Sequence, residues 1–384
     1  MDRLIRCITK DGAIMASAVD STNIVYTAQK IHQLTPAATA ALGRLLTASS
    51  MMGAQLKQEG ASLTLKVSGD GPIGSMVAVA YSSGCCKGYV VNPHAQAENY
   101  PNGKLNVAGV VGKNGILYVM RDYGAGEPYM GQIPLASGEI AEDITSYYAA
   151  SEQIPTVCAL GVLCDKSEGE ALLSGGLLIQ LLPAAGEEAV ARLEKNISLL
   201  EPVTTMLAKG LSIEEMVGKA LEGFEWEILE ERKVAYVCDC SKERVVRAVT
   251  SLPNDEILSL ADERGFAEAG CQFCNRKYRI SKEELLRIVE EKIKKRLGKS
   301  VDFLFGNIVL YNSSLRAPRK KAFENGVFGS IAQLGEHLPY KQGVTGSSPV
   351  VPTTGFPDKT ESIWPEFEKN RAEAFRIWPG SSAG

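Results

Sequence analysis

Four cysteines towards the C-terminal side of the chain have the spacing most suggestive of chemistry. Cys238 and Cys240 form a C-D-C motif, and Cys271 and Cys274 form a C-Q-F-C motif thirty residues further on. Two close pairs separated in this way can supply four thiolates to one tetrahedral Zn²⁺. The same pairs can also oxidise to local disulfides. The sequence therefore predicts a site that is either metal-bound or oxidised, which makes it a candidate redox switch.

The spacing of the first pair departs from that of a standard zinc finger. The C-x-x-C half resembles a zinc knuckle, whereas a single residue between Cys238 and Cys240 is a tighter bite than usual. A disulfide across Cys238 and Cys240 would close a small, strained ring, and strained disulfides are labile. On the cysteines alone, a structural zinc clamp without a redox role stays open as an alternative.

Charge and size both link the cysteines to folding of the C-terminal region. Four thiolates on one Zn²⁺ carry a net charge of about -2, which nearby Lys242, Arg244, Arg276 and Lys277 can moderate. Structural zinc contributes on the order of 10 kcal/mol or more to the folding of small units. We therefore expect oxidation to unfold this region and to free whatever surface it covers.

The remaining cysteines are expected to be ordinary buried residues, because a thiol in a reducing compartment behaves as a small hydrophobe. They are Cys7, Cys85, Cys86, Cys158 and Cys164.

Composition narrows the class of protein. The chain has 384 residues, 45% of them hydrophobic, and a formal charge of -4, which suits a globular protein of two or three domains. The mild acidity gives no argument for nucleic acid or an anionic membrane as a partner. Neither a long apolar run nor an N-terminal secretory signal is visible. We therefore expect a cytoplasmic protein without membrane contacts.

The elements that must position the cysteines predict an α+β fold. A β-rich N-terminal body with helices is expected over residues 1–183, in which residues 1–33 are interpreted as strands and turns and residues 62–135 as strands. Within it, Thr35 and Pro36 mark the start of a helix whose leucines fall on one face. A further helix is expected over residues 141–152, and a final strand over residues 176–182.

A helical connector and a small zinc-binding module are expected to follow. The connector, residues 184–233, contains a capping box at Ser212 and an apolar stripe of Leu193, Ile197 and Leu200, which could be masked in the folded state and exposed on release. The module, residues 234–296, is expected to place two short helices between the cysteine pairs, over residues 243–251 and 255–264. Its last helix begins at Ser281.

At this point the motifs resemble those of a known family. The two cysteine pairs, together with residues 241–244 directly after the first pair, closely resemble the redox-regulated heat-shock chaperones of bacteria, the thirty-three-kilodalton heat shock proteins. The resemblance extends over about residues 1–296. Its other landmarks are His32, Thr35-Pro36, and residues 41–44, 69–72, 129–135, 151–156 and 178–183.

This resemblance implies an ATP-independent holdase, which is not an enzyme. It implies that one Zn²⁺ per chain is held by Cys238, Cys240, Cys271 and Cys274 in the reduced, inactive form. It further implies that hypochlorous acid, or peroxide with heat, joins Cys238 to Cys240 and Cys271 to Cys274 and ejects the zinc. The module and connector then lose structure, homodimers form, and the exposed apolar surface holds unfolding client proteins.

Two other classes of function are considered. A zinc ribbon that binds nucleic acid or a protein partner predicts a basic, aromatic face; residues 276–279 offer a small one, which acidic residues of the last helix dilute. An enzyme using the β-rich body would need a nucleophile paired with a base. The body holds only His32 and His94 as histidines, and no such pairing has a familiar spacing.

The last part of the chain, residues 297–384, is interpreted as a disordered, non-native tail. Periodicity is lost there, and the codons that residues 332–337 and 346–349 permit match the D-arm and T-arm of a transfer RNA gene. Residues 338–342 permit a hairpin with the valine anticodon in its loop. We infer that a lost stop codon or a frameshift joined the coding sequence to a downstream valine transfer RNA gene. A genuine disordered tail is the alternative.

The nucleotide sequence of the gene tests this interpretation. We expect the segment that encodes residues 330–353 to fold as a cloverleaf at the RNA level. Codons that cannot form the D-arm, anticodon and T-arm helices would rule the interpretation out.

Overall fold

The structure is a computed structural model that describes residues 2–166 and 169–297. The predicted tail lies outside these residues, apart from Leu297. The chain forms two compact units that divide between Cys238 and Asp239, and each is described separately. The predicted α+β class is confirmed, with a β-rich N-terminal body, helices, and the four cysteines towards the C-terminal side.

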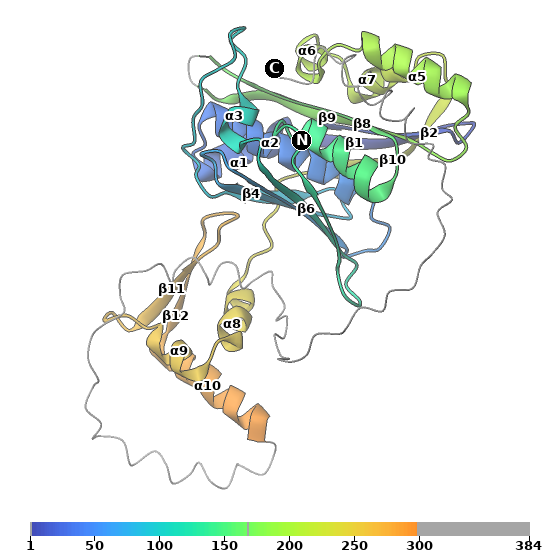
Figure 1. Cartoon of the computed structure of the whole chain (residues 1–384). Helices are drawn as coiled ribbons and strands as arrows, with labels where there is room; N and C mark the ends of the chain where they lie inside the picture. The colour runs from blue at the N-terminus through green and yellow to red at the C-terminus, as the bar shows by residue number, and fades with distance from the viewer. Residues whose placement is uncertain (1, 167–168, 298–384) are drawn as a thin grey trace, which may run out of the picture. The chain divides into compact units, whose positions relative to one another are not determined.

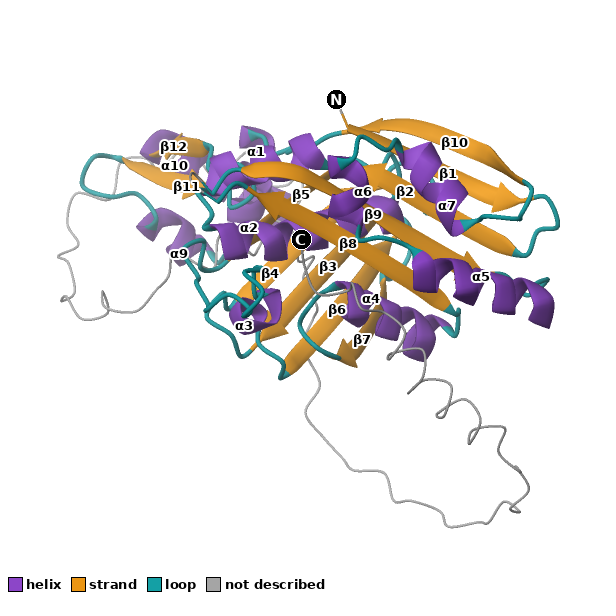
Figure 2. Ribbon diagram, turned by 90° about the horizontal axis from the view of Figure 1, so that it is seen from above, coloured by secondary structure: helices purple, strands orange, loops and turns teal. Residues whose placement is uncertain are grey.

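Two five-stranded antiparallel sheets form the larger unit (Figures 1 and 2). Strand order in the first sheet is β10 (Trp226–Val234), β1 (Asp2–Thr9), β2 (Ile14–Asp20), β9 (Ala171–Leu181), β8 (Thr156–Cys164). Strand order in the second is β5 (Cys86–Val90), β4 (Ser75–Tyr81), β3 (Ser62–Gly69), β6 (Gly115–Asp122), β7 (Tyr129–Pro134). The predicted β-rich stretch over residues 62–135 is therefore confirmed.

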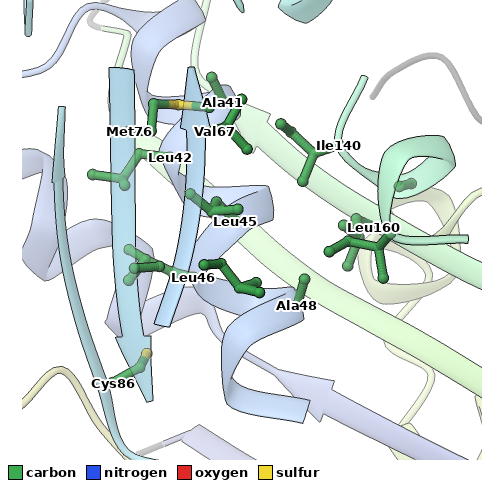
Figure 3. Packing of buried hydrophobic residues seen from close by; sticks show 14 of the residues in the cluster. Ala41, Leu42, Leu45, Leu46, Ala48, Val67, Met76, Cys86, Ile140 and Leu160 are labelled. Carbon is green, nitrogen blue, oxygen red and sulfur yellow. The ribbon is translucent and has the colours of Figure 1, made fainter. Parts of the chain in front are cut away.

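Helix α2 (Pro36–Gly53) forms the centre of this unit, because it packs against strands of both sheets. It begins where the sequence predicts: the Thr35 side chain accepts a hydrogen bond from the Ala38 N–H, and Pro36 occupies the first turn. The prediction of a single apolar face was too narrow. Every residue of the helix after Pro36 is buried, since a helix between two sheets has no solvent-facing side. Figure 3 shows part of this core, with Leu42 and Leu45 near Met76 and Val67 of the second sheet.

One segment of the body differs from the prediction. Residues 1–33 were expected in strands and turns, but residues 22–32 form helix α1 (Thr22–His32). A short apolar run does not by itself distinguish helix from strand. The Asp2 carboxylate stabilises the start of the helix by accepting the N–H groups of Asn23 and Ile24, at 3.0 and 2.7 Å. A contact between distant parts of the chain therefore caps α1, and local sequence does not reveal it.

The opposite face of the first sheet is covered by helices α5 (Glu187–Leu199), α6 (Val203–Ala208) and α7 (Ile213–Ala220). Strand residues such as Ile5 and Ile179 form one buried cluster with Leu193, Ile197 and Met216 of these helices. The predicted capping box at Ser212 is present, with Glu215 as its partner. Of the apolar stripe expected in residues 184–233, Leu193 and Ile197 are thus buried in the folded chain, and Leu200 is half-buried. The same residues also contain most of β10, which the sequence did not predict.

The remaining elements of the larger unit connect the sheets. Helix α3 (Val107–Val111) follows β5, while α4 (Ala141–Tyr147) continues into a π-helical turn, η1 (Tyr148–Glu152), as a predicted helix over residues 141–152 requires.

The described part of the smaller unit consists of three helices and one hairpin. Helices α8 (Lys242–Ser251) and α9 (Asn254–Ser259) precede the hairpin of β11 (Phe266–Gly270) and β12 (Lys277–Ser281), which leads into α10 (Lys282–Leu297). Helix α9 ends at Ser259 and is shorter than predicted, because the chain turns before β11, where the Gly265 N–H donates to the Asp262 carbonyl at 3.0 Å. The start of α10 is as predicted: Ser281 and Glu284 exchange hydrogen bonds in a capping box.

Candidate metal centre

The four cysteines singled out in the sequence come together in space. The sulfur atoms of Cys238, Cys240, Cys271 and Cys274 all lie within 4.8 Å of one another. The Cys240 and Cys274 sulfurs lie 3.3 Å apart, well beyond the bonded distance of about 2.05 Å. The cysteines are present as thiols rather than disulfides. The four sulfur atoms are therefore close enough together to bind a single ion.

The second pair is held by the turn of the β11–β12 hairpin. The Cys271 N–H donates to the Arg276 carbonyl at 2.9 Å, and the Asn275 N–H donates to the Cys271 carbonyl at 2.8 Å. This tight turn needs a left-handed residue, and Asn275 supplies it with φ of 58°; asparagine tolerates that conformation better than most residues. The turn brings Cys271 and Cys274 to the same side. The resemblance to a zinc knuckle is thus confirmed at the level of backbone geometry.

The first pair lies directly before a helix. Ser241 caps α8 by accepting the Arg244 N–H, so the positive end of the helix dipole is next to Cys240 in the chain. Asp239, between the two cysteines, pairs with Arg244 at 2.5 Å. A helix N-terminus favours the thiolate form of a nearby cysteine. The helix start and the ion pair also fix the backbone of the short C-D-C bite.

Tyr278 is a residue of this centre that the sequence analysis did not assign. Its hydroxyl donates to both the sulfur and the carbonyl oxygen of Cys240, each at 3.0 Å. It extends from β12, opposite Ala269 of β11. A tyrosine four residues after the last cysteine was the available signal. Its contact with the first pair depends on the fold, because 38 positions separate Tyr278 from Cys240.

The four cations expected to moderate the charge of the centre have different partners. Lys242 pairs with Glu284 at 2.7 Å, Arg244 with Asp239, and Lys277 with Glu268 at 3.0 Å. Arg276 is the one whose electrostatics involve the cluster. A hydrogen bond with Tyr278, followed by the charges of Cys240 and Cys274, raises the pKa of its guanidinium.

The donor set fits a metal ion. In a tetrahedral site with metal–sulfur distances of about 2.3 Å, the sulfurs are separated by roughly 3.8 Å. Mutual distances of up to 4.8 Å, with one of 3.3 Å, bracket that value. Four thiolates and no oxygen or nitrogen ligand are typical of closed, structural sites. The four cysteines could therefore hold one metal ion.

The five other cysteines have a different environment. Cys7, Cys86 and Cys158 are buried, as predicted, whereas Cys85 and Cys164 are half-buried. Burial raises the pKa of Cys7 and of Cys164 to about 12, and it raises the pKa of Cys86 and Cys158 as well. Thiols of this kind stay protonated near neutral pH and react slowly.

A segment directly before the first cysteine is attached to the second sheet. The Cys86 N–H donates to the Ala235 carbonyl at 3.0 Å, and the Val237 N–H donates to the Cys86 carbonyl at 2.8 Å. The Tyr236 hydroxyl donates to the Gly88 carbonyl at 2.7 Å, beside His32. We call residues 235–237 the strap. It joins the edge of the second sheet, at β5, to Cys238, which follows it in the chain.

Comparisons with known proteins agree on one family. Residues 2–281 match the family model described as Hsp33 protein. The chain is 46% identical over 290 residues to the 33 kDa chaperonin of Clostridioides difficile, a match that covers 76% of this chain and 99% of the relative. It is 43% identical over 291 residues to the 33 kDa chaperonin of Bacillus licheniformis, which covers 76% of this chain and all of the relative.

The fold is also that of a solved structure. The crystal structure of the 33 kDa chaperonin (heat shock protein 33 homolog) of Thermotoga maritima has a TM-score of 0.69 to this chain at 32% identity. The match covers 76% of this chain and 99% of that one. In the described part of the chain, no helix is long and apolar enough to cross a membrane.

Thiol reactivity of the reduced chain tests the separation of the cysteines into two groups. At pH 8, a thiol with a pKa of about 12 is only about 0.01% thiolate, so Cys7 and Cys164, with Cys86 and Cys158, should react only in denaturant. We expect a chelator to make four more thiols reactive in the native protein, because it exposes the cluster. Denatured chain, with all nine thiols reactive, is the control. An equal count of reactive thiols before and after chelation would contradict a metal-bound cluster.

Proposed function

The chain belongs to the Hsp33 family of chaperones, and from that premise we propose that it is a redox-regulated, ATP-independent holdase. The observation that carries the proposal is the group of four cysteine sulfurs within 4.8 Å of one another. Binding of unfolded client proteins follows from the family. The redox control is inferred from the chemistry of the sulfurs, and so is the cytoplasmic, reducing location that such a switch requires.

The resting form is proposed to hold one Zn²⁺ through Cys238, Cys240, Cys271 and Cys274. Zinc in a four-sulfur site supplies a cross-link and no redox chemistry of its own. The smaller unit, as far as residue 297, has few other sources of stability, since its core there contains six buried residues, among them Val249, Ile257 and Leu285. Domains this small often depend on a metal to fold.

Oxidation is proposed to convert the four ligands into two disulfides, Cys238–Cys240 and Cys271–Cys274. In each pair, two thiolates give up two electrons and form one S–S bond. One hypochlorous acid accepts both electrons and leaves as chloride and hydroxide. Disulfide sulfurs are poor metal ligands because only the thiolate coordinates strongly. The zinc is then released, and the smaller unit loses its cross-link.

The strap is proposed to link oxidation of the four cysteines to a change in the larger unit. Residues 235–237 are fixed at β5 on one side and continue into Cys238 on the other. On the N-terminal side they follow β10, in which only Val234 among nine residues is buried. Arg3 of β1 pairs with Glu231 of β10 and with Glu214 of α7 at 2.9 and 2.6 Å. Elements with few buried contacts are the first to open.

The client-binding surface is proposed to include what this opening uncovers. Helices α5 to α7 bury Leu193, Ile197 and Met216 against the first sheet. Their release would expose two complementary apolar surfaces, one on the helices and one on the sheet. Large exposed apolar patches bind unfolded chains and also self-associate. The same surfaces are therefore proposed to support a homodimer in the oxidised state.

No observation favours a zinc ribbon that binds nucleic acid. Most basic residues in and near the hairpin are already paired with carboxylates: Lys277 and Arg279 both contact Glu268, and Arg264 contacts Asp262. Phosphate binding would have to displace these carboxylates, which weakens the electrostatic attraction that such binding relies on.

Light scattering by a heat-denatured client tests the redox proposal. We expect the reduced, zinc-loaded chain to leave aggregation nearly unchanged. Chain treated with hypochlorous acid should suppress aggregation at near-stoichiometric ratios while releasing about one zinc per chain. Cys271→Ser should abolish the difference between the two states, whereas Cys85→Ser, outside the cluster, should preserve it. Equal suppression by the reduced and oxidised wild-type chain would end the proposal.

Tyr236→Phe tests the role of the strap. The substitution removes the hydrogen bond to the Gly88 carbonyl and should weaken the attachment of residues 235–237 by about 1 kcal/mol. We expect activation by a given dose of oxidant to be several-fold faster, with metal content unchanged. Tyr26→Phe, at an exposed position of α1, controls for the loss of a surface hydroxyl. Activation at the wild-type rate, with normal stability, would show that the strap does not restrain the switch.

A further inference from the structure

The second sheet ends at β7, an outer strand that pairs only with β6 (Figure 2). Its sequence is YMGQIP, and it contains no charged residue. Its residues alternate between exposed and buried after Tyr129, so one face of the strand is open to solvent. Met130 is 61% exposed and Tyr129 is 47% exposed. Exposed strand edges are sites where another chain can add a strand.

The backbone groups that point away from β6 follow from the register. Leu135 donates its N–H to the Gly115 carbonyl at 2.9 Å, and Leu117 lies opposite Ile133, Val119 opposite Gly131. Because the direction of the N–H and C=O groups alternates along a strand, the odd-numbered residues of β7 bond to β6. Met130 and Gln132 therefore turn both groups towards the open edge. Among the described residues, no hydrogen bond satisfies either N–H.

Prolines limit this edge at both ends. Pro134 occupies the next outward-facing position and has no N–H, and Pro128 directly precedes the strand. The edge therefore offers two donors, flanked by positions that cannot donate. A short strand can add here, but the ladder cannot extend.

The three other outer strands of the larger unit are protected. The edge of β5 is paired with the strap at Cys86. Five of the nine residues of β10 are charged, which discourages the pairing of another strand. The central residues of β8, from Cys158 to Val162, are all buried. Only β7, among the sheet edges in the described part of this unit, is at once exposed, uncharged and without a backbone partner.

We propose that the open edge of β7 binds an extended segment of unfolded polypeptide, by addition of that segment as a sixth strand to the second sheet. Backbone N–H and C=O groups are common to all sequences, so two donors and their carbonyls recognise a chain because it is unfolded. Met130 adds a flexible apolar contact that adapts to different side chains. The edge is formed in the reduced chain, so this site does not depend on the redox switch, although its occupant rests on the binding of unfolded clients in the proposed function.

A second copy of the chain is a less suitable occupant. Two strands of six residues, each with two outward donors, would bury far less than the roughly 1,200 Å² of a specific dimer. An unfolded client needs no such area, because a weak site gains strength when the same client also contacts a second surface.

The test uses the reduced, zinc-loaded full-length chain and a fluorescent eight-residue peptide of alternating valine and threonine. We expect binding by fluorescence anisotropy with an affinity on the order of 100 μM. The same peptide methylated on its central amide nitrogens should bind at least tenfold more weakly. Gln132→Pro should cause a similar loss, because it removes one outward N–H. Gln132→Ala, which keeps that N–H, should bind as the wild type does.

The outcomes separate the alternatives. Equal binding of both peptides, or wild-type binding by a folded Gln132→Pro chain, would overturn the proposal. If Gln132→Pro fails to fold, the methylated peptide alone decides. Concentration-dependent dimers of the reduced chain that Gln132→Pro abolishes would assign the edge to a second copy instead. Peptide binding should be unchanged by oxidant, so failure of the redox switch in the aggregation assay leaves this result interpretable.

Discussion

Four cysteine sulfurs within 4.8 Å of one another place a strict electrostatic condition on the chain. Two unit charges about 4 Å apart repel by roughly 4 kcal/mol at an effective dielectric constant near 20, and four thiolates contain six such pairs. The cluster is therefore compatible with protonated thiols, with a bound cation, or with sulfur–sulfur bonds. These are chemically distinct states with different numbers of cross-links. The control that we propose for this chaperone is a transition from the cation-bound state to the state with sulfur–sulfur bonds.

The state of the four sulfurs matters because the smaller unit has few other stabilising interactions. Among its described residues the core is a single small cluster. Cys271 lies at the hairpin turn, and Cys240 directly precedes the N-cap of α8. The larger unit is different: α2 is buried between two sheets, and its core is independent of the metal centre. A change at the sulfurs can thus remove one unit's stability and leave the other's intact. A holdase of the proposed kind needs that difference, because a body that unfolded with the switch would have no surface to present.

The sequence revealed the parts of this arrangement that depend on residue type and local spacing. Cys238, Cys240, Cys271 and Cys274 could be recognised from their spacing, and the caps at Thr35, Ser212 and Ser281 from local patterns. Other features depend on contacts between distant segments. Helix α1 is capped by Asp2, β10 is a strand because it pairs with β1, and Tyr278 reaches Cys240 across 38 positions. The charged sequence of β10 has no alternation of apolar residues, so no periodicity could have identified it.

The edges of the sheets connect the fold to both proposals. A chaperone must expose groups that bind unfolded chains and yet avoid adding strands to itself. Here the edge at β5 is closed by the strap, whose attachment depends on four backbone and side-chain hydrogen bonds at Cys86 and Gly88. If the strap detaches when Cys238 is no longer held, β5 becomes a second open edge in the same sheet as β7. The second sheet would then gain an edge on its other side in the oxidised state only, while β7 stays available in both states. The metal centre would then control whether the edge at β5 is open, but not whether the edge at β7 is open.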